Sequence, residues 1–252
     1  MCRLILARGT FKVADVLGAA VAMATGQTAD HDGPITCHPN GWGAIWRTPD
    51  GFGTHRDVRP IGDSADDSPL VGLDTDFLAV HARHATLPRN HGLACTHPLE
   101  RHDPDGTWYF MHNGFMPTVY GLLGLEESAF DSAEYFDYAV PPGAATPDGS
   151  TLLERLAAIP PGGNSGNAIA VGPDRARVIH WSPEPIGLPR YFTMHRLEQP
   201  GLLVIASEIV PALAGAEHWR PVPAQSILDI PLPGAPQEGE RREPDNVEAS
   251  RV

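Results

Sequence analysis

Cysteine is scarce in this chain of 252 residues, which contains three, at positions 2, 37 and 95. An odd number at irregular spacings does not make the paired framework of a disulfide-rich secreted domain. No Cys-x-x-Cys or His-x-x-x-His pair has a matching second pair, so the sequence predicts no zinc site. We expect no metal and no cofactor, and a reducing cytoplasm in which Cys2 stays a free thiol.

Basic residues and long apolar runs are also lacking. Lys and Arg number 18 against 31 Asp and Glu, a formal net charge of −13, which argues against the basic surface that a nucleic-acid-binding protein needs. No apolar run approaches the roughly 18 residues of a membrane span, and the N-terminus lacks the basic and apolar regions of a secretory signal. We therefore expect a cytoplasmic protein with no nucleic-acid partner and no membrane partner.

Two common catalytic signatures are absent as well. The sequence has no Gly-x-Ser-x-Gly elbow of a serine hydrolase and no Gly-x-x-x-x-Gly-Lys loop for a phosphate.

Apolar residues make up 42% of the chain, which is enough for a sizeable core at this length. We predict one domain over residues 1–232 and a disordered acidic, proline-rich tail over 233–252, which has almost nothing to bury.

The chain does contain 26 Gly and 26 Pro, a composition that favours short strands and many turns. Helical spacing of apolar residues predicts helices over 12–25, 131–140 and 150–159. The acidic stretch 62–69 is predicted to be a surface loop. Predicted strands cover 2–7, 44–47 with a hairpin turn at 49–53, the start of 76–85, 108–111, 167–171, 177–181 and 201–207. Strands, then helices, then strands indicate segregated layers, an α+β architecture.

Cys2 is the first candidate for chemistry. Once Met1 is removed, Cys2 carries both a thiol and a free α-amine, whose ordinary pKa is about 7.7–8.0. That amine can act as the base for the thiol, so no separate catalytic His is needed. The alternative is a buried strand residue, because Cys is among the most buried residue types. Taken by itself, the N-terminal stretch favours that alternative.

Two polar clusters follow predicted strands, where rigid elements would aim side chains into one pocket. In the first, Arg83 is a candidate clamp for a carboxylate and Thr86 adds a hydroxyl. The alternative is an Arg in a solvated surface loop. In the second, Gly114 would let the backbone turn sharply, so that its N–H and the Asn113 amide form an oxyanion hole. Asn-Gly is also the commonest hairpin turn, which is the alternative there.

Taken together in chain order, these sequence segments resemble the class II glutamine amidotransferases, which are N-terminal-nucleophile hydrolases whose Cys becomes the first residue after maturation. The chain is most similar to the stand-alone glutaminase-like branch, which includes the ergothioneine-pathway γ-glutamyl hydrolases. Five segments in family order carry the resemblance: MCRL at 1–4; HPNGWG at 38–43, with Asn40 in place of the family's Asp; HARHAT at 81–86; THPL at 96–99 with WYFMHNG at 108–114; and IASE at 205–208.

The resemblance implies a four-layer αββα N-terminal-nucleophile hydrolase sandwich. It also implies that the chain cleaves a glutamine or γ-glutamyl amide through a thioester on Cys2. In that mechanism Asn113 and Gly114 would hold the oxyanion, Arg83 would bind the substrate α-carboxylate, and His97 and Thr86 would lie around the substrate.

One position of the family pattern departs in this chain. Asp131 would bind the substrate α-ammonium, and Ala133 replaces a family Glu in the same segment. Asp148, before the next helix, is the alternative. The expected partner is a small-molecule γ-glutamyl substrate, with a homo-oligomer or a separate synthase partner left open. A non-catalytic ligand-binding or partner subunit with the same fold is the alternative function. The leaving amine is not identified by the sequence.

Overall fold

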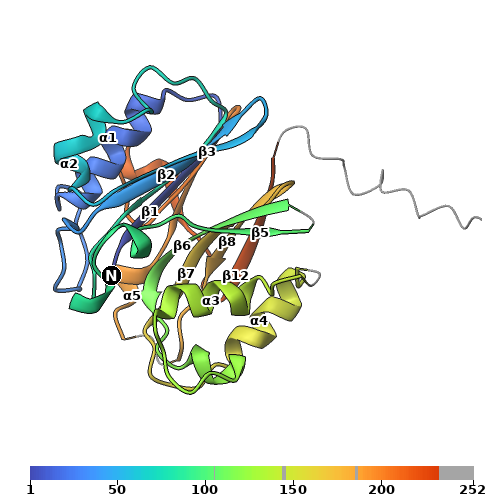
Figure 1. Cartoon of the computed structure of the whole chain (residues 1–252). Coiled ribbons are helices and arrows are strands. Elements are labelled where there is room, and N and C mark those ends of the chain that lie inside the picture. The colour runs from blue at the N-terminus through green and yellow to red at the C-terminus, as the bar shows by residue number, and fades with distance from the viewer. Residues whose placement is uncertain (105, 144–145, 185–186, 233–252) are drawn as a thin grey trace, which may run out of the picture.

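The computed structural model describes residues 1–104, 106–143, 146–184 and 187–232. The predicted tail, 233–252, lies outside the described residues. Two antiparallel sheets pack face to face, with helices on both outer faces (Figure 1). The helices are α1 (Val13–Ala24), α2 (Ile61–Ser64), α3 (Asp131–Ala139), α4 (Gly149–Ala157) and α5 (Pro189–Phe192).

The first sheet has seven strands and the second has five. The first contains, in spatial order, β11 (Trp219–Pro221), β9 (His195–Gln199), β10 (Leu202–Ala206), β1 (Arg3–Gly9), β4 (Phe77–Ala82), β2 (Trp42–Thr48) and β3 (Gly51–Asp57). The second contains β12 (Ser226–Pro231), β8 (Arg175–His180), β7 (Ser165–Val171), β6 (Gly106–Phe115) and β5 (Leu99–Asp103). The N-terminal strand is thus central in the first sheet.

Alternation along the strands builds three apolar cores. In β1, Ile5 and Ala7 pack in the core with α1, whereas Leu4 and Leu6 pack in the core between the two sheets, as expected when successive side chains point to opposite faces. A third core joins the second sheet to α3 and α4. The chain is therefore a four-layer αββα sandwich, as the resemblance implied. Cys2 has the parity of Leu4, which directs it between the sheets.

The prediction of a surface loop over 62–69 is wrong. Helix α2 begins at Ile61, and a 3₁₀ turn follows over Ala65–Asp67. Ile61 is fully buried in the core beside α1, and Ser64 accepts a hydrogen bond from Trp42 Nε1 at 2.8 Å. These two tertiary contacts fix a segment whose acidic composition is typical of a loop.

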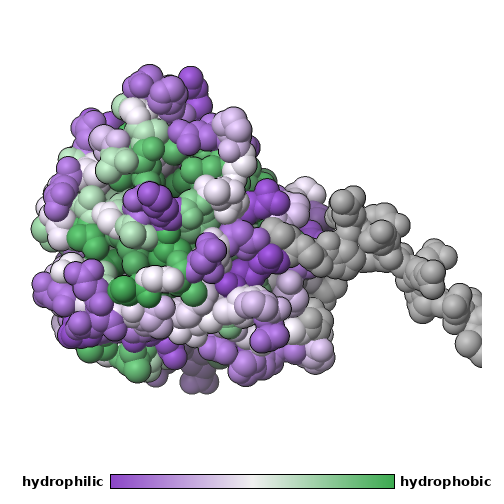
Figure 2. Space-filling model, turned by 90° about the horizontal axis from the view of Figure 1, so that it is seen from above, coloured by the Kyte–Doolittle hydropathy of each residue, from purple (hydrophilic) through white to green (hydrophobic). Residues whose placement is uncertain are grey.

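One face of the molecule carries an apolar area. Seen from above, apolar side chains gather there among hydrophilic ones (Figure 2). A cavity of about 580 Å³ lies between α1 and residues 62–74, and Leu17, Leu70 and Leu73 contribute to its walls. None of the helices in the described part of the chain combines the length and apolar composition that crossing a membrane requires.

Candidate active site

Cys2 immediately precedes β1 and lies where the two sheets meet. Its side chain is buried, with 7% of the residue exposed. Its backbone N–H donates a hydrogen bond to Asn113 Oδ1 at 2.7 Å, and its Sγ lies 3.8 Å from the carbonyl oxygen of His84. These contacts join the start of β1 to β6 of the other sheet and to the segment after β4, so the thiol lies among polar groups from three elements.

Asn113 and Gly114 lie inside β6, which extends to Phe115. Asn113 pairs with Asn167 and Gly114 with Gly166 on β7. The hairpin-turn alternative and the expected sharp turn at Gly114 are both wrong. A Cβ at Gly114 would lie 1.8 Å from the Ser165 carbonyl oxygen, so glycine is required here by the close approach of β7.

The Asn113 amide is the most informative group in the site. Its oxygen accepts the hydrogen bond from Cys2, while its Nδ2 is buried and has no hydrogen-bond partner within the described chain. Leaving a buried donor unpaired costs about 1–3 kcal/mol. Such a donor beside a nucleophile is what the binding of a developing oxyanion requires.

Arg83 directly follows β4 and is only 3% exposed, so the alternative of a solvated surface Arg is wrong. Asn40 fixes the segment, because its N–H donates to the Arg83 carbonyl at 2.9 Å and its Oδ1 accepts from the Ala85 N–H at 3.0 Å. The guanidinium donates to the Asn90 carbonyl. Its Nη1 is buried and unpartnered among the described residues, which leaves a donor for an anionic group.

The structure distinguishes the two aspartates that the sequence offers for the substrate α-ammonium. Asp131 begins α3, is buried, accepts a hydrogen bond from the Met116 N–H at 2.9 Å and lines the same cavity as Cys2. Asp148 instead caps α4 by accepting from the Thr151 N–H at 2.8 Å, and it is exposed. Only Asp131 is therefore placed to contact a molecule bound beside Cys2.

The cavity beside Cys2 has a volume of about 20 Å³, room for about one water molecule. Met1 forms part of its wall, and the Met1 ammonium donates to the His84 carbonyl at 2.9 Å and to Thr86 Oγ1 at 3.5 Å. Met1 therefore fills space next to the thiol. The cavity brings together Cys2, Arg83, Thr86, His97, Gly114 and Asp131. Of the predicted site residues, Asn113 alone does not line it and instead contacts Cys2 directly.

Two buried histidines, His97 in the wall of the cavity and His81 behind it, lie next to each other. The rings of His81 and His97 have centroids 4.3 Å apart. Burial, followed by the charge of His81, lowers the pKa of His97 well below its usual value. Neither ring nitrogen of His97 has a hydrogen-bond partner among the residues described. His97 is thus a neutral, buried wall of the site.

His81 influences the thiol, although sequence reasoning gave it no role. Its Nε2 lies 3.1 Å from the His112 carbonyl oxygen. Because a carbonyl only accepts, Nε2 carries the proton. Burial alone raises the pKa of the Cys2 thiol, but the interactions with His81 and the N-terminal ammonium lower it to about 6. The sequence did contain one signal for this role, because His81 lies two residues before Arg83 and so has the same side-chain parity.

This pKa predicts a pH dependence for the thiol. Cys2 should ionise with a midpoint near pH 6, against about 8.5 for a free Cys. His81→Gln should move the midpoint upward, because the interaction with His81 that favours the thiolate is lost. The ultraviolet absorbance of the thiolate, followed against pH in a Cys37→Ser/Cys95→Ser chain, measures this. An unchanged midpoint in His81→Gln would show that another group sets the pKa.

Arg3 anchors the start of β1, another role that sequence reasoning missed. It is fully buried, forms an ion pair with Glu208, and its guanidinium lies 4.1 Å from the centre of the Tyr191 ring. It also donates to the Cys2 carbonyl at 3.0 Å. Ser207 Oγ accepts from the Leu4 N–H at 3.0 Å. The segment 205–208 therefore fixes the backbone next to Cys2 rather than contacting the cavity.

No family model matches the sequence, and no curated protein matches it. Among solved structures, the chain is similar to the glutamine phosphoribosylpyrophosphate amidotransferase from B. subtilis complexed with ADP and GMP. The TM-score is 0.62 at 14% identity, over 91% of this chain and 49% of that one. A structure described as the allosteric regulatory enzyme of purine biosynthesis gives 0.63 at 16% identity, over 91% and 47%. This is the class II glutamine amidotransferase fold.

The comparisons also give the share of each structure that this chain covers. The chain spans about half the length of those two structures. A glutamine aminotransferase class-II domain protein from Silicibacter pomeroyi is matched over 91% of this chain and 99% of that one, at 13% identity and a TM-score of 0.48. The fold agrees with the four-layer sandwich that the five sequence segments implied.

Proposed function

We propose that the domain over residues 1–232, after removal of Met1, hydrolyses the side-chain amide of glutamine or of a γ-glutamyl compound, with Cys2 as the nucleophile. The Asn113 amide is the observation that carries this proposal. It accepts a hydrogen bond from the nitrogen of Cys2 and offers beside it a buried N–H₂ that has no partner among the residues described. One side chain thus orients the nucleophile and supplies a donor for the oxyanion.

The reaction follows from these groups. The α-amine of Cys2 takes the thiol proton, and the thiolate attacks the amide carbonyl carbon. The carbonyl oxygen becomes an oxyanion held by Asn113 Nδ2 and the Gly114 N–H. The carbon–nitrogen bond then breaks, and the leaving amine takes the proton from the α-ammonium. Water, deprotonated by the same amine, attacks the thioester and releases the acid and the thiol.

The surroundings of the N-terminus suit an amine that acts as a base. Burial lowers the pKa of the Met1 ammonium in this position. After Met1 is removed, the amine of Cys2 lies beside the same desolvating groups. A lower pKa keeps a larger fraction of the amine unprotonated near neutral pH.

Two charged side chains support a glutamyl substrate. Arg83 Nη1 would donate to the α-carboxylate, and Asp131 would accept from the α-ammonium. Both residues are buried and line the cavity of Cys2. Because an unpaired buried charge is costly, a substrate that supplies both opposite charges is favoured. Removal of Met1 would vacate space for it, with Thr86 and His97 beside it.

Asp131→Asn should lower kcat/KM for glutamine by at least about 30-fold, because one partner of a buried charge pair is lost. Asp148→Ala is the matched control. It should leave kcat/KM unchanged and cost about 1 kcal/mol of stability through loss of the helix cap. Steady-state kinetics with thermal unfolding measures both effects. The reverse pattern would assign the α-ammonium to Asp148.

Glutamate release from glutamine and from γ-glutamyl amides by the Met1-free chain tests the proposed function. We expect release from at least one of these substrates. A folded chain that binds glutamine but releases no glutamate would instead match a non-catalytic binding subunit.

A further inference from the structure

A second cavity, of about 320 Å³, adjoins the cavity of Cys2. Asn90 and Asp131 line both. This volume is at the lower end of pockets that bind small molecules, whereas the Cys2 cavity accommodates little more than a water molecule. The site therefore has room beyond a single glutamyl group.

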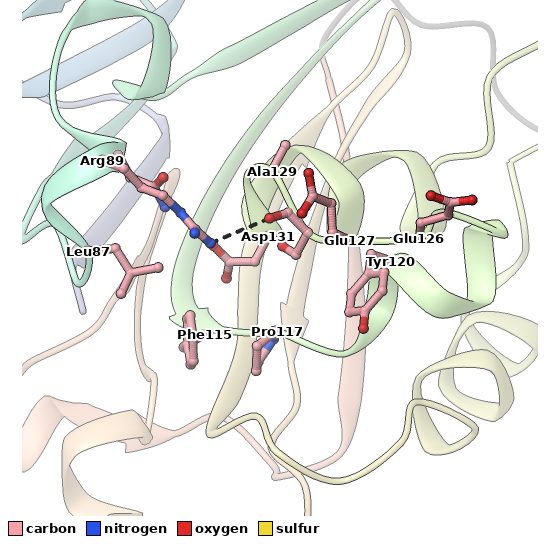
Figure 3. A pocket seen from close by; sticks show the side chains of 11 residues that line it. Leu87, Arg89, Phe115, Pro117, Tyr120, Glu126, Glu127, Ala129 and Asp131 are labelled. Atoms are coloured by element: carbon pink, nitrogen blue, oxygen red, sulfur yellow. Dashed lines mark hydrogen bonds between the residues drawn. The ribbon is translucent and has the colours of Figure 1, made fainter.

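Three segments build the second cavity (Figure 3). Leu87 and Arg89 come from the segment after β4, Phe115 and Pro117 from the end of β6, and residues 126–129 from the segment before α3. In Figure 3, Arg89 lies on one side and Glu126 and Glu127 on the other. Buried Glu134 fixes the last segment.

The hydrogen bonds of Glu134 make this wall a defined surface. Its Oε1 accepts from the N–H groups of Ala129 and Phe130 at 2.7 and 3.0 Å, and its Oε2 accepts from Ser128 Oγ at 2.7 Å. Three hydrogen bonds accepted by one buried carboxylate hold the segment just before Asp131. The acidic side of the cavity is therefore pre-formed.

The shared residues show which end of a substrate the cavity faces. Asp131 is the group proposed for the α-ammonium, and the Asn90 carbonyl accepts from the Arg83 guanidinium. Both lie at the end that would hold the α-carbon, away from the reacting amide. The second cavity would thus receive a group attached at the α-position rather than the leaving amine.

Charge and shape narrow the chemistry of that group. Glu126, Glu127 and Asp131 contribute three carboxylates to the walls, against the single cation of Arg89, which donates to the Ser128 carbonyl at 3.4 Å. Phe115 and Tyr120 add aromatic surface. A net negative wall with aromatic rings favours a cationic group with an apolar stem.

We propose that this cavity is a subsite for a cationic aminoacyl group joined to the α-nitrogen of a C-terminal glutamine. The substrate class is then a short peptide that ends in glutamine, whose free carboxylate still pairs with Arg83. Its α-nitrogen is an amide N–H that donates to Asp131, and the cationic aminoacyl group supplies the positive charge that the α-ammonium supplies in free glutamine. Hydrolysis consumes one water, breaks the side-chain carbon–nitrogen bond and gives a peptide ending in glutamate, plus ammonium. This inference rests on the proposed function and adds the identity of the extension.

Dipeptides test the inference with the Met1-free chain. Ammonia release should give kcat/KM in the order Lys-Gln, then Gly-Gln, then Glu-Gln, with Gln-Lys poorest because it lacks the free α-carboxylate. Glu126→Gln/Glu127→Gln should lower kcat/KM for Lys-Gln by about three- to tenfold, as expected for two exposed ion pairs, and leave free glutamine unchanged. Asp63→Asn/Asp66→Asn removes two exposed carboxylates elsewhere and should change neither.

Hydrolysis of glutamine but of no Xaa-Gln dipeptide would overturn the subsite while leaving the proposed function intact. A preference for Glu-Gln would overturn the cationic assignment and show that Arg89 dominates. If no substrate is hydrolysed, calorimetry with the Cys2→Ala chain separates the two claims. Lys-Gln binding that weakens in the Glu126→Gln/Glu127→Gln variant supports the subsite, and absence of binding overturns it.

Discussion

Replacement of Cys2 by Ala in the Met1-free chain is expected to lower kcat/KM for glutamine by at least about four orders of magnitude, the scale on which loss of a covalent nucleophile acts. The physical reason is that no other thiol reaches the cavity, since Cys37 and Cys95 do not line it. Glutamate release at saturating and limiting glutamine measures the loss.

Cys37→Ala is the matched control for that replacement. Cys37 is an exposed thiol whose Sγ lies 3.7 Å from the Thr25 carbonyl oxygen, away from the Cys2 cavity. It should keep full activity. Retention of more than about one per cent of the activity in Cys2→Ala would place the nucleophile elsewhere, because such residual activity exceeds what positioning groups supply without a nucleophile.

Asn113→Ala has the second-largest expected effect, a fall in kcat of about 100- to 1,000-fold. The Nδ2 donor has no partner among the described residues and would be used only when negative charge develops on the substrate oxygen. For that reason KM should change little. Asn113→Ala also removes the acceptor of the Cys2 nitrogen, so a second variant is needed to separate the two roles.

Asn113→Asp provides that separation. Its carboxylate keeps an acceptor for the Cys2 nitrogen but replaces the Nδ2 donor by an oxygen, which repels an oxyanion. We expect a loss in kcat at least as large as in Asn113→Ala, with the fold checked by circular dichroism. A kcat close to that of the unchanged chain would show that the amide only positions Cys2.

Much of the fold was predictable because local patterns report it. The helical spacing over 12–25 corresponds to α1, and the apolar runs correspond to β1, β4 and β10. The family resemblance predicted that Arg83 and Asp131 lie near Cys2, and both line its cavity. Each of these signals is contained in a short stretch of sequence, whose periodicity or residue types are visible without knowledge of distant contacts.

The features of the fold and the site that local patterns do not predict depend on contacts between residues far apart in the sequence. The ion pair of Arg3 with Glu208 joins residues 205 positions apart, and no local pattern predicts it. Gly114 lies inside a strand because β7 approaches closely, whereas Asn-Gly in isolation suggests a turn. Asp131 begins α3 and Asp148 caps α4, so both lie at helix starts, and only the packing of α3 against β6 brings one of them to the thiol.

The central claim is that Cys2 is the nucleophile of an amidohydrolase. The most direct test is mass spectrometry of the Met1-free chain after reaction with a glutamine-analogue electrophile. We predict one adduct per chain, located on Cys2, and none on Cys2→Ala. Labelling of Cys37 or Cys95 in place of Cys2, or equal labelling of Cys2→Ala, would contradict the account.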